Sequence, residues 1–478
     1  MPSKGVHAFT YIAVAGCSIE LSVPGQTIVR DECNHFCADI FEVDTKHIDS
    51  FFDKRGKFAF KVLQHGRLIT EQWIDVNAIT GNASGGTMDT IASTPSVFDS
   101  EGSLIVTYGL YEAGSGHGLL PNRHQCYVTV TPNYANWMGN LAPPGSAHEE
   151  KRFSRLVLPS AHDVGMNSMQ SSEAVLEKVG GAIVGVLVGD TVSGRALMSR
   201  LADIVSGPAI SLIAPSIIFS LAITQKDSLD AMLQIGARYF EFRPARLHDA
   251  VRPTGALPDK VYFEHSAIPG MAYDAFLNDV VAFLMAHRDE IVVVQLRWDG
   301  VPGECAHPSD DEQREYIEAA LAQANGEIVA GGLDDLRNAS IAQLRREKRR
   351  LIVMVSVDSL STYTDEGNAT VNGDSIVSAF PSVLTAENQR GKAFINIQCQ
   401  ATASNIPEAI VYSVMEAGTT TSCLLATKGI CDSKTLPWCR DNVLRTCNTE
   451  TLVVLMNDFI DGATADVAVQ LSRQRLDL

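Results

Sequence analysis

Seven short apolar runs after residue 150 constrain the fold of this chain more than any other feature. Each run is continuous rather than alternating, which is typical of parallel strands buried on both faces. Their spacing leaves room for intervening helices, and no glycine-rich phosphate loop follows the first run, which argues against an open doubly wound sheet. The runs are Leu156–Pro159, Tyr239–Phe242, Val261–Phe263, Ile291–Leu296, Leu351–Val355, Phe394–Ile397 and Leu452–Met456. With an eighth strand near Ile376–Leu384, they predict an α/β fold, a distorted TIM-type (β/α) barrel over residues 151–478.

The first 145 residues have a different pattern. Short alternating stretches such as Phe58–Leu63, Ser103–Tyr108 and Gln125–Thr131 are separated by Gly, Asn, Ser and Pro. This pattern predicts an all-β, sandwich-like accessory domain over residues 1–145, joined to the barrel through Pro143–Glu150. Two roles stay open for this domain: binding or docking, and stabilisation of the barrel.

The formal charge of −18 argues against binding to nucleic acid and against docking on anionic membranes by charge alone. A chain this acidic lacks the basic surface that neutralises nucleic-acid phosphates, and charge alone would not hold it on an anionic membrane. Met1–Gly16 lacks a basic segment followed by an apolar core, so no signal peptide is evident. We therefore expect a cytoplasmic or peripheral membrane location.

An apolar insert of about residues 174–224 separates the first two runs. No charged residue lies between Asp203 and Lys226, but Pro208 and Pro215 interrupt the segment, so a spanning helix is not expected. Two interpretations remain. The insert forms helices buried between the domains, or it forms a hydrophobic lip that enters a lipid surface.

Four cysteines recur every eight residues in a segment that reads as a loop: Cys423, Cys431, Cys439 and Cys447. Zinc sites do not have this even spacing, and no histidine lies within the segment. Coincidence or a local disulfide pair is favoured over a metal site.

Charged or amide side chains follow most of the apolar runs. In a barrel, the carboxyl ends of the strands meet at one mouth, where such enzymes carry their catalytic groups. Period-two alternation places Glu241 and Arg243 on one face of the second run and Phe242 on the other. Each residue has a structural explanation of its own, such as a helix cap, but their convergence favours a shared site. The candidates are His162, Asp163, Glu241, Arg243, His265, Arg297, Asp299, Asp358, Gln398 and Asp458.

Two histidines beside an arginine suit the cleavage of a phosphodiester. A neutral imidazole can remove the proton of the attacking hydroxyl while a protonated imidazole supplies the leaving alkoxide. A guanidinium group stabilises the charge that develops on the phosphoryl oxygens. Asp458 is the candidate carboxylate that fixes the tautomer of the base.

These residues lie in segments that resemble the X-domain family of phosphatidylinositol-specific phospholipase C. Pro159–Met166 is similar to its first signature, and Gln225–Arg243 to its second, a helix that leads into a strand ending in acidic-x-Arg. The resemblance extends over about residues 151–465. Weaker matches are Phe263–His265, Glu290–Leu296 and Leu452–Phe459.

The resemblance implies a metal-independent, bacterial-type active site in a distorted barrel. A phosphoinositide would be cleaved to diacylglycerol and a cyclic inositol phosphate. His162 would be the general base and His265 the general acid, with Arg243 on the phosphoryl charge and Glu241 and Asp163 in support. Calcium-dependent members are acidic where this chain has Arg243, so we expect no metal and no cofactor.

The head group stays open at this stage. Ser266 stands where a glycine is more usual, and Glu241 is one methylene longer than the aspartate typical of the bacterial type. Inositol hydroxyls would need polar contacts, for which the candidates are Arg297, Asp299, Asp358, Tyr363 and Gln398. The alternatives are a phosphodiesterase acting on another glycerophospholipid or sphingolipid diester, and a non-catalytic barrel that binds lipids or glycans.

Overall fold

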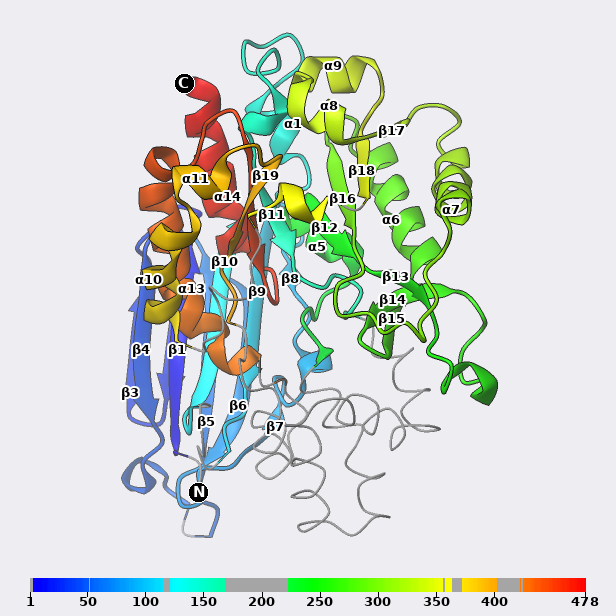
Figure 1. Cartoon of the computed structure of the whole chain (residues 1–478). Coiled ribbons are helices and arrows are strands. Elements are labelled where there is room, and N and C mark those ends of the chain that lie inside the picture. The colour runs from blue at the N-terminus through cyan, green and yellow to red at the C-terminus, as the bar shows by residue number, and fades with distance from the viewer. Residues whose placement is uncertain are drawn as a thin grey trace.

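The N-terminal part of the computed structural model consists of two facing five-stranded sheets (Figure 1). The first has the order β4-β1-β10-β9-β8 and the second the order β3-β2-β5-β6-β7. The strands are β1 (Gly5–Ile12), β2 (Cys17–Val23), β3 (Gln26–Arg30), β4 (Phe36–Glu42), β5 (Arg55–Gln64), β6 (Arg67–Asn77), β7 (Ala83–Gly86), β8 (Val97–Phe98), β9 (Leu104–Tyr111) and β10 (His124–Pro132). The structure describes residues 3–50, 52–114, 121–167, 222–355, 357–362, 372–401, 422 and 424–478.

A shared apolar core lies between these two sheets. Every second residue of β2 is buried, and side chains such as Phe41 of β4 and Phe58 of β5 meet there at 5.7 Å between ring centroids. β9 is buried along its whole length, on both faces. A second layer therefore covers the outer face of this sheet.

The rest of the chain is built on a seven-stranded parallel sheet with the order β17-β18-β16-β12-β11-β20-β19. Its strands are β11 (Val157–Ala161), β12 (Tyr239–Phe242), β16 (Val292–Leu296), β17 (Ala330–Gly331), β18 (Leu351–Val355), β19 (Phe394–Gln398) and β20 (Leu452–Asn457). The ladder of hydrogen bonds among the described residues is open. A single bridge, Ser361 to Phe394, connects the chain after β18 to β19. The mixed α/β class is as expected, whereas closure into a barrel stays a prediction.

Helices pack around this sheet. They are α1 (Trp137–Leu141), α5 (Leu229–Ile235), α6 (Tyr273–Ala286), α7 (Asp310–Ala322), α8 (Leu333–Asn338), α9 (Ile341–Arg346), α10 (Gly373–Val383), α11 (Ala386–Gln389), α13 (Leu425–Thr446) and α14 (Gly462–Asp477). Within the described residues, no helix is both long and apolar enough to cross a bilayer.

Two of the strands expected from the sequence are corrected here. The run Val261–Phe263 belongs to β14 (Val261–His265), which lies in a separate antiparallel sheet between β13 (Pro244–Arg246) and β15 (Ile268–Ala272). The eighth strand expected near Ile376–Leu384 is helix α10, whose buried residues Ile376 and Phe380 are one turn apart. An apolar run does not by itself distinguish a buried helix face from a strand.

The segment of evenly spaced cysteines is also not a loop. It forms α13, in which Cys431 and Cys439 are buried free thiols, and Cys447, likewise buried and free, caps its end. Cys423 lies outside the described residues, and so does nearly all of the apolar insert.

Helices α13 and α14 lie between the N-terminal sheets and the parallel sheet (Figure 1). Gly429 of α13 packs against Phe9, and Gly462 at the start of α14 packs against Thr131. A Cβ atom would lie 2.3 Å from the Phe9 ring at Gly429 and 2.2 Å from the Thr131 hydroxyl at Gly462. The same two helices also contact β9, which explains why β9 is buried on both faces.

Candidate active site

The register of two neighbouring parallel strands brings His162 and Asp458 together. Ala161 of β11 pairs with Asn457 of β20, so the next residue of each strand lies at the same edge of the sheet. The His162 backbone N–H donates to the Asn457 carbonyl, and His162 Nδ1 lies 2.7 Å from Asp458 Oδ1. Asp458 therefore fixes the ring and leaves Nε2 available for chemistry.

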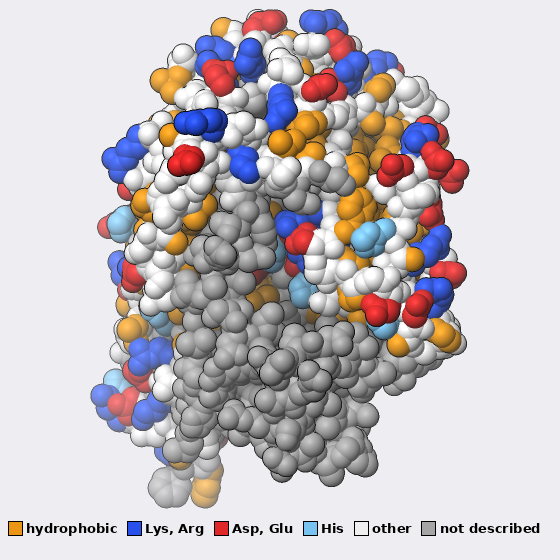
Figure 2. Space-filling view, viewed as in Figure 1, with side chains coloured by type: hydrophobic (Ala, Val, Ile, Leu, Met, Phe, Trp, Pro, Cys, Tyr) orange, Lys and Arg blue, Asp and Glu red, His pale blue; other side chains and the backbone are white. Residues whose placement is uncertain are grey.

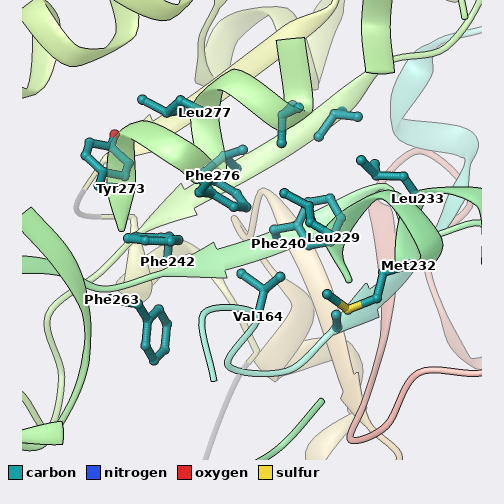
Figure 3. Close-up of a cluster of buried hydrophobic side chains, with 14 of the residues drawn as sticks. Val164, Leu229, Met232, Leu233, Phe240, Phe242, Phe263, Tyr273, Phe276 and Leu277 are labelled. Atoms are coloured by element: carbon teal, nitrogen blue, oxygen red, sulfur yellow. The ribbon is translucent and has the colours of Figure 1, made fainter. Parts of the chain in front are cut away.

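The alternation of β12 separates its apolar side chain from its charged ones. Phe242 lies in the apolar cluster in Figure 3, with ring centroids 4.6 Å from Phe276 and 5.3 Å from Phe263. Glu241 and Arg243 lie on the opposite face of the strand, towards His162 and Asp163. The packing of Phe242 thus orients the two charged groups.

Asp163 is the centre of the charged cluster. Its Oδ1 lies 2.9 Å from Arg243 Nη2, and its Oδ2 lies 3.5 Å from His265 Nε2 and 3.7 Å from His162 Nε2. Burial alone would raise the pKa of Asp163, but the charges of Arg243, His162 and His265 hold it well below its usual range. Figure 2 shows red, blue and pale-blue side chains close together near the centre of this face.

A short antiparallel hairpin brings His265 to this cluster. β14 folds back from β13, with Phe263 paired to Pro244, so His265 returns to the strand that carries Arg243. Gly165 makes this possible, because a Cβ atom there would lie 2.2 Å from Phe263 Cβ. The glycine after the His-Asp pair is therefore required by the hairpin.

Three residues that follow site residues have positive φ angles without being glycine. They are Asp163 at 44°, Ser266 at 56° and Phe459 at 45°, after His162, His265 and Asp458 respectively. Left-handed backbone is costly for such residues and concentrates at functional sites.

The two histidines have opposite ionisation tendencies. Burial lowers the pKa of His162, but Asp163, Asp458 and Glu241 outweigh burial and raise the pKa to about 10. Burial also lowers the pKa of His265; Asp163 opposes this shift, while Arg243 and His162 reinforce it. At neutral pH the resting site therefore holds one imidazolium, at His162, and one neutral imidazole, at His265.

The residues expected to contact the substrate do not all lie within the charged cluster. Arg297 is buried and binds Glu241 through Nη1 at 2.6 Å, and its Nη2 lies 2.7 Å from Asp299 Oδ2. Gln398 pairs in register with Met456, so its backbone lies two residues before the level of Asp458. The side chain of Asp358 and all of Tyr363 lie outside the described residues.

His162, Asp163 and Glu241 offer three possible metal ligands within 4.8 Å of one another. Two guanidinium groups already contact the carboxylates, Arg243 on Asp163 and Arg297 on Glu241. A divalent ion at this point would be repelled by both cations. The geometry fits a site whose positive charge is supplied by arginine.

Two further residues position the site and were missed in the sequence. Gln225 Nε2 donates to the carbonyls of His162 and Asn457 at 2.9 and 3.1 Å, which links the ends of β11 and β20. Lys428 of α13 is buried against Asp432, which accepts a hydrogen bond from Asn457 Nδ2 at 2.9 Å. Gln225 begins the helix–strand signature, but only the fold shows its partners.

No protein-family model and no curated protein matches the sequence. Solved structures of two bacterial enzymes are similar to the chain. A variant of the phosphatidylinositol-specific phospholipase C from Staphylococcus aureus aligns with a TM-score of 0.39 and 13% identity, over 70% of this chain and 96% of that one. The enzyme of the same name from Listeria monocytogenes aligns with a TM-score of 0.38 and 13% identity, over 71% and 98%.

Proposed function

We propose that this chain is a phosphodiesterase of the phospholipase C type that acts on a phosphoinositide without a metal ion. One observation carries the proposal. The Nε2 atoms of His162 and His265 lie within 3.7 Å of the same oxygen of Asp163, while Arg243 holds the other oxygen at 2.9 Å. Two imidazoles and a guanidinium therefore lie together around Asp163, and they can supply the base, the acid and the positive charge that phosphodiester cleavage needs.

In the proposed reaction, the inositol 2-hydroxyl attacks phosphorus. A new P–O bond forms as the hydroxyl proton passes to one imidazole, and the P–O bond to diacylglycerol breaks as the other imidazole protonates the leaving oxygen. The products are diacylglycerol and a cyclic inositol phosphate. Arg243 stabilises the charge on the non-bridging oxygens. Its contact with Asp163 keeps the guanidinium group oriented for this role.

We assign the base to His162 and the acid to His265, because a carboxylate on Nδ1 stabilises the imidazolium that a base becomes. The raised pKa of His162 means that the active form is a minor one at neutral pH. A bound phosphodiester adds negative charge beside His265, which favours its protonated form. Substrate binding thus favours the protonated form that His265 needs to act as the acid.

The lipid is proposed to reach the site from a membrane surface, with the apolar insert of residues 174–224 as the contact. Its freedom from charge between Asp203 and Lys226 supports this role. Glycerophospholipid and sphingolipid diesters with other head groups remain alternatives, as does a non-catalytic lipid- or glycan-binding protein.

The test is a panel of inositol, choline and glycerol phosphodiesters presented with and without chelator. We expect cyclic inositol phosphate from phosphatidylinositol, with a rate that the chelator does not change. His162→Ala and His265→Ala should each lower kcat by about 10²–10⁴-fold, the usual contribution of general acid–base catalysis.

His287→Ala is the matched control, because His287 is bonded to Asn136 at the far end of α6 and should keep full activity. Activity that vanishes with chelator and returns with calcium would contradict the metal-free mechanism. Turnover of a choline or glycerol diester alone would show that the substrate carries that head group instead of inositol. No turnover of any diester would favour the binding protein.

A further inference from the structure

A second group of metal-ligating side chains lies in the N-terminal part of the chain, where it crosses from β3 to β4. Glu32, His35 and Cys37 each offer one ligand atom, and the three atoms lie within 4.8 Å of one another. Glu32 and His35 are exposed, and Cys37 is half-buried at the start of β4. Because β3 and β4 belong to different sheets, this crossing forms one end of the sandwich.

Contacts from three other elements hold the backbone between these ligands. Asn34 has a φ of 58°, and its N–H donates to the Ile12 carbonyl at 2.7 Å. Its Oδ1 accepts from Tyr11 of β1 at 3.3 Å and from Gln470 of α14 at 3.1 Å. Its carbonyl accepts from Arg440 of α13 at 2.9 Å. The ligands are therefore presented by a fixed turn.

The donor set identifies the class of ion. Calcium and magnesium take oxygen ligands, whereas a thiolate with an imidazole and a carboxylate suits zinc. In tetrahedral coordination, ligands at 2.0–2.3 Å from an ion lie roughly 3–4 Å apart, so the three atoms, which lie within 4.8 Å of one another, need only a small approach to close on an ion. Three protein ligands leave one position for water.

The charges around this crossing differ from those in the candidate active site. Two cations lie near the crossing, and each has a partner outside the ligand group: Arg30 binds Asp39, with Nε 2.9 Å from Oδ2, and Arg440 donates to the Asn34 carbonyl. In the candidate active site, by contrast, Arg243 contacts Asp163 at 2.9 Å, within the candidate ligand group itself. Of the two groups, the one at the β3–β4 crossing is thus the one open to a cation.

We propose that Glu32, His35 and Cys37 bind a zinc ion that joins the two sheets at the β3–β4 crossing. Because Asn34 in the same turn is held by α13 and α14, the ion also stiffens the junction between the sandwich and these helices. The site is independent of the phosphodiesterase reaction.

The test uses the full chain, freed of metal with a chelator and kept reduced with a phosphine. Titration with Co²⁺ is expected to give one equivalent of binding and a near-ultraviolet thiolate-to-metal absorption band, which Zn²⁺ then displaces. Cys37→Ser should abolish the band, and His35→Gln and Glu32→Gln should each weaken binding by roughly tenfold or more. Zn²⁺ should raise the melting temperature of the wild type and leave that of Cys37→Ser unchanged.

Cys33→Ser is the matched control, since Cys33 is an exposed thiol in the same turn and lies outside the ligand group. It should retain the band and the affinity, and so should His162→Ala. The proposal is overturned if the wild type binds no stoichiometric ion, if the band survives in Cys37→Ser, or if His162→Ala abolishes binding. Each variant's melting curve without metal shows whether it is folded.

Discussion

The ionisation of His162 is the property on which the proposed chemistry depends most directly. Asp163, Asp458 and Glu241 raise its pKa to about 10, and a general base works only in its neutral form. If His162 is the base, kcat/KM should rise with pH until His162 is largely neutral. If it is the acid, kcat/KM should fall over the same range.

Asp458→Asn separates these roles. Loss of the carboxylate lowers the pKa of His162. The limb of the pH profile that reports the ionisation of His162 should therefore move to lower pH. We expect a rising limb that moves in this way, together with a maximal rate reduced about a hundredfold or more because the ring loses its orientation. The pH profile of kcat/KM is the measurement, with the exposed Asp441→Asn as control. A falling limb that moves to lower pH would reverse the assignment of base and acid.

The sequence predicts the members of the site better than it predicts their pairing. Parallel strands bring their carboxyl ends to one edge of the sheet, and this rule can be applied to the sequence alone. It accounts for the convergence of His162, Asp163, Glu241, Arg243 and Asp458. The pairing of Arg297 with Glu241 depends on which long side chain reaches which neighbour. That choice is made by three-dimensional packing, which a one-dimensional pattern does not contain.

At the scale of elements, the approach of β14 to the turn after β11 determines where His265 lies. The Gly165 backbone contacts Phe263, and its carbonyl also lies close to Gly270. Gly165→Ala would place a methyl group 2.2 Å from Phe263 Cβ, so the hairpin would have to move. We expect a loss of about 1–3 kcal/mol in the free energy of unfolding, as in other overpacked cores.

The same substitution should reduce kcat/KM by about tenfold or more, because a displacement of about 1 Å in a catalytic group is costly. Urea unfolding and steady-state kinetics measure the two effects. Gly303→Ala is the control, since a Cβ atom there meets nothing within 4 Å. Wild-type stability and activity in Gly165→Ala would show that the hairpin does not depend on this contact.

The elements that the sequence predicted well are those with the strongest physical signal. Runs such as Ile291–Leu296, in which Gln295 is the one polar residue, are mostly apolar because helices and sheet bury both faces of the strand. Val261–Phe263 is equally apolar, but it pairs with the antiparallel strands β13 and β15. A run of three residues does not show which strands it pairs with. In α13, Pro437 and a mixed polar surface hide the helical period, so the segment resembled a loop.

For the whole molecule, the main question is whether the sandwich is a separable unit. Asp466 of α14 accepts hydrogen bonds from Tyr11 and from Tyr134, both from the N-terminal part of the chain. Burial raises the pKa of this carboxyl. The hydrogen bonds from the two hydroxyls oppose that rise, because they stabilise the carboxylate. We therefore expect the two parts to unfold together.

The double variant Tyr11→Phe/Tyr134→Phe tests this expectation. It should lower the free energy of unfolding by about 1–3 kcal/mol, because a buried carboxyl loses two donors. Hydrogen exchange in peptides from β5 and β18 should report the same shift, since a single cooperative unit contains both strands. Tyr262→Phe, whose hydroxyl bonds Pro258 away from this interface, is the control. A shift confined to β5 would make the sandwich an independent domain.

The bond between Tyr11 and Asp466 joins residues 455 positions apart, and this separation matters while the protein is being made. The sheet that contains β1 and β10 leaves the ribosome first, because the helices that cover its outer face begin only at Leu425. At about 5–20 residues per second, roughly tens of seconds pass before α14 is available. During that interval the apolar surface of β9 and β10 is exposed on the nascent chain, which makes it the stage of synthesis most prone to aggregation.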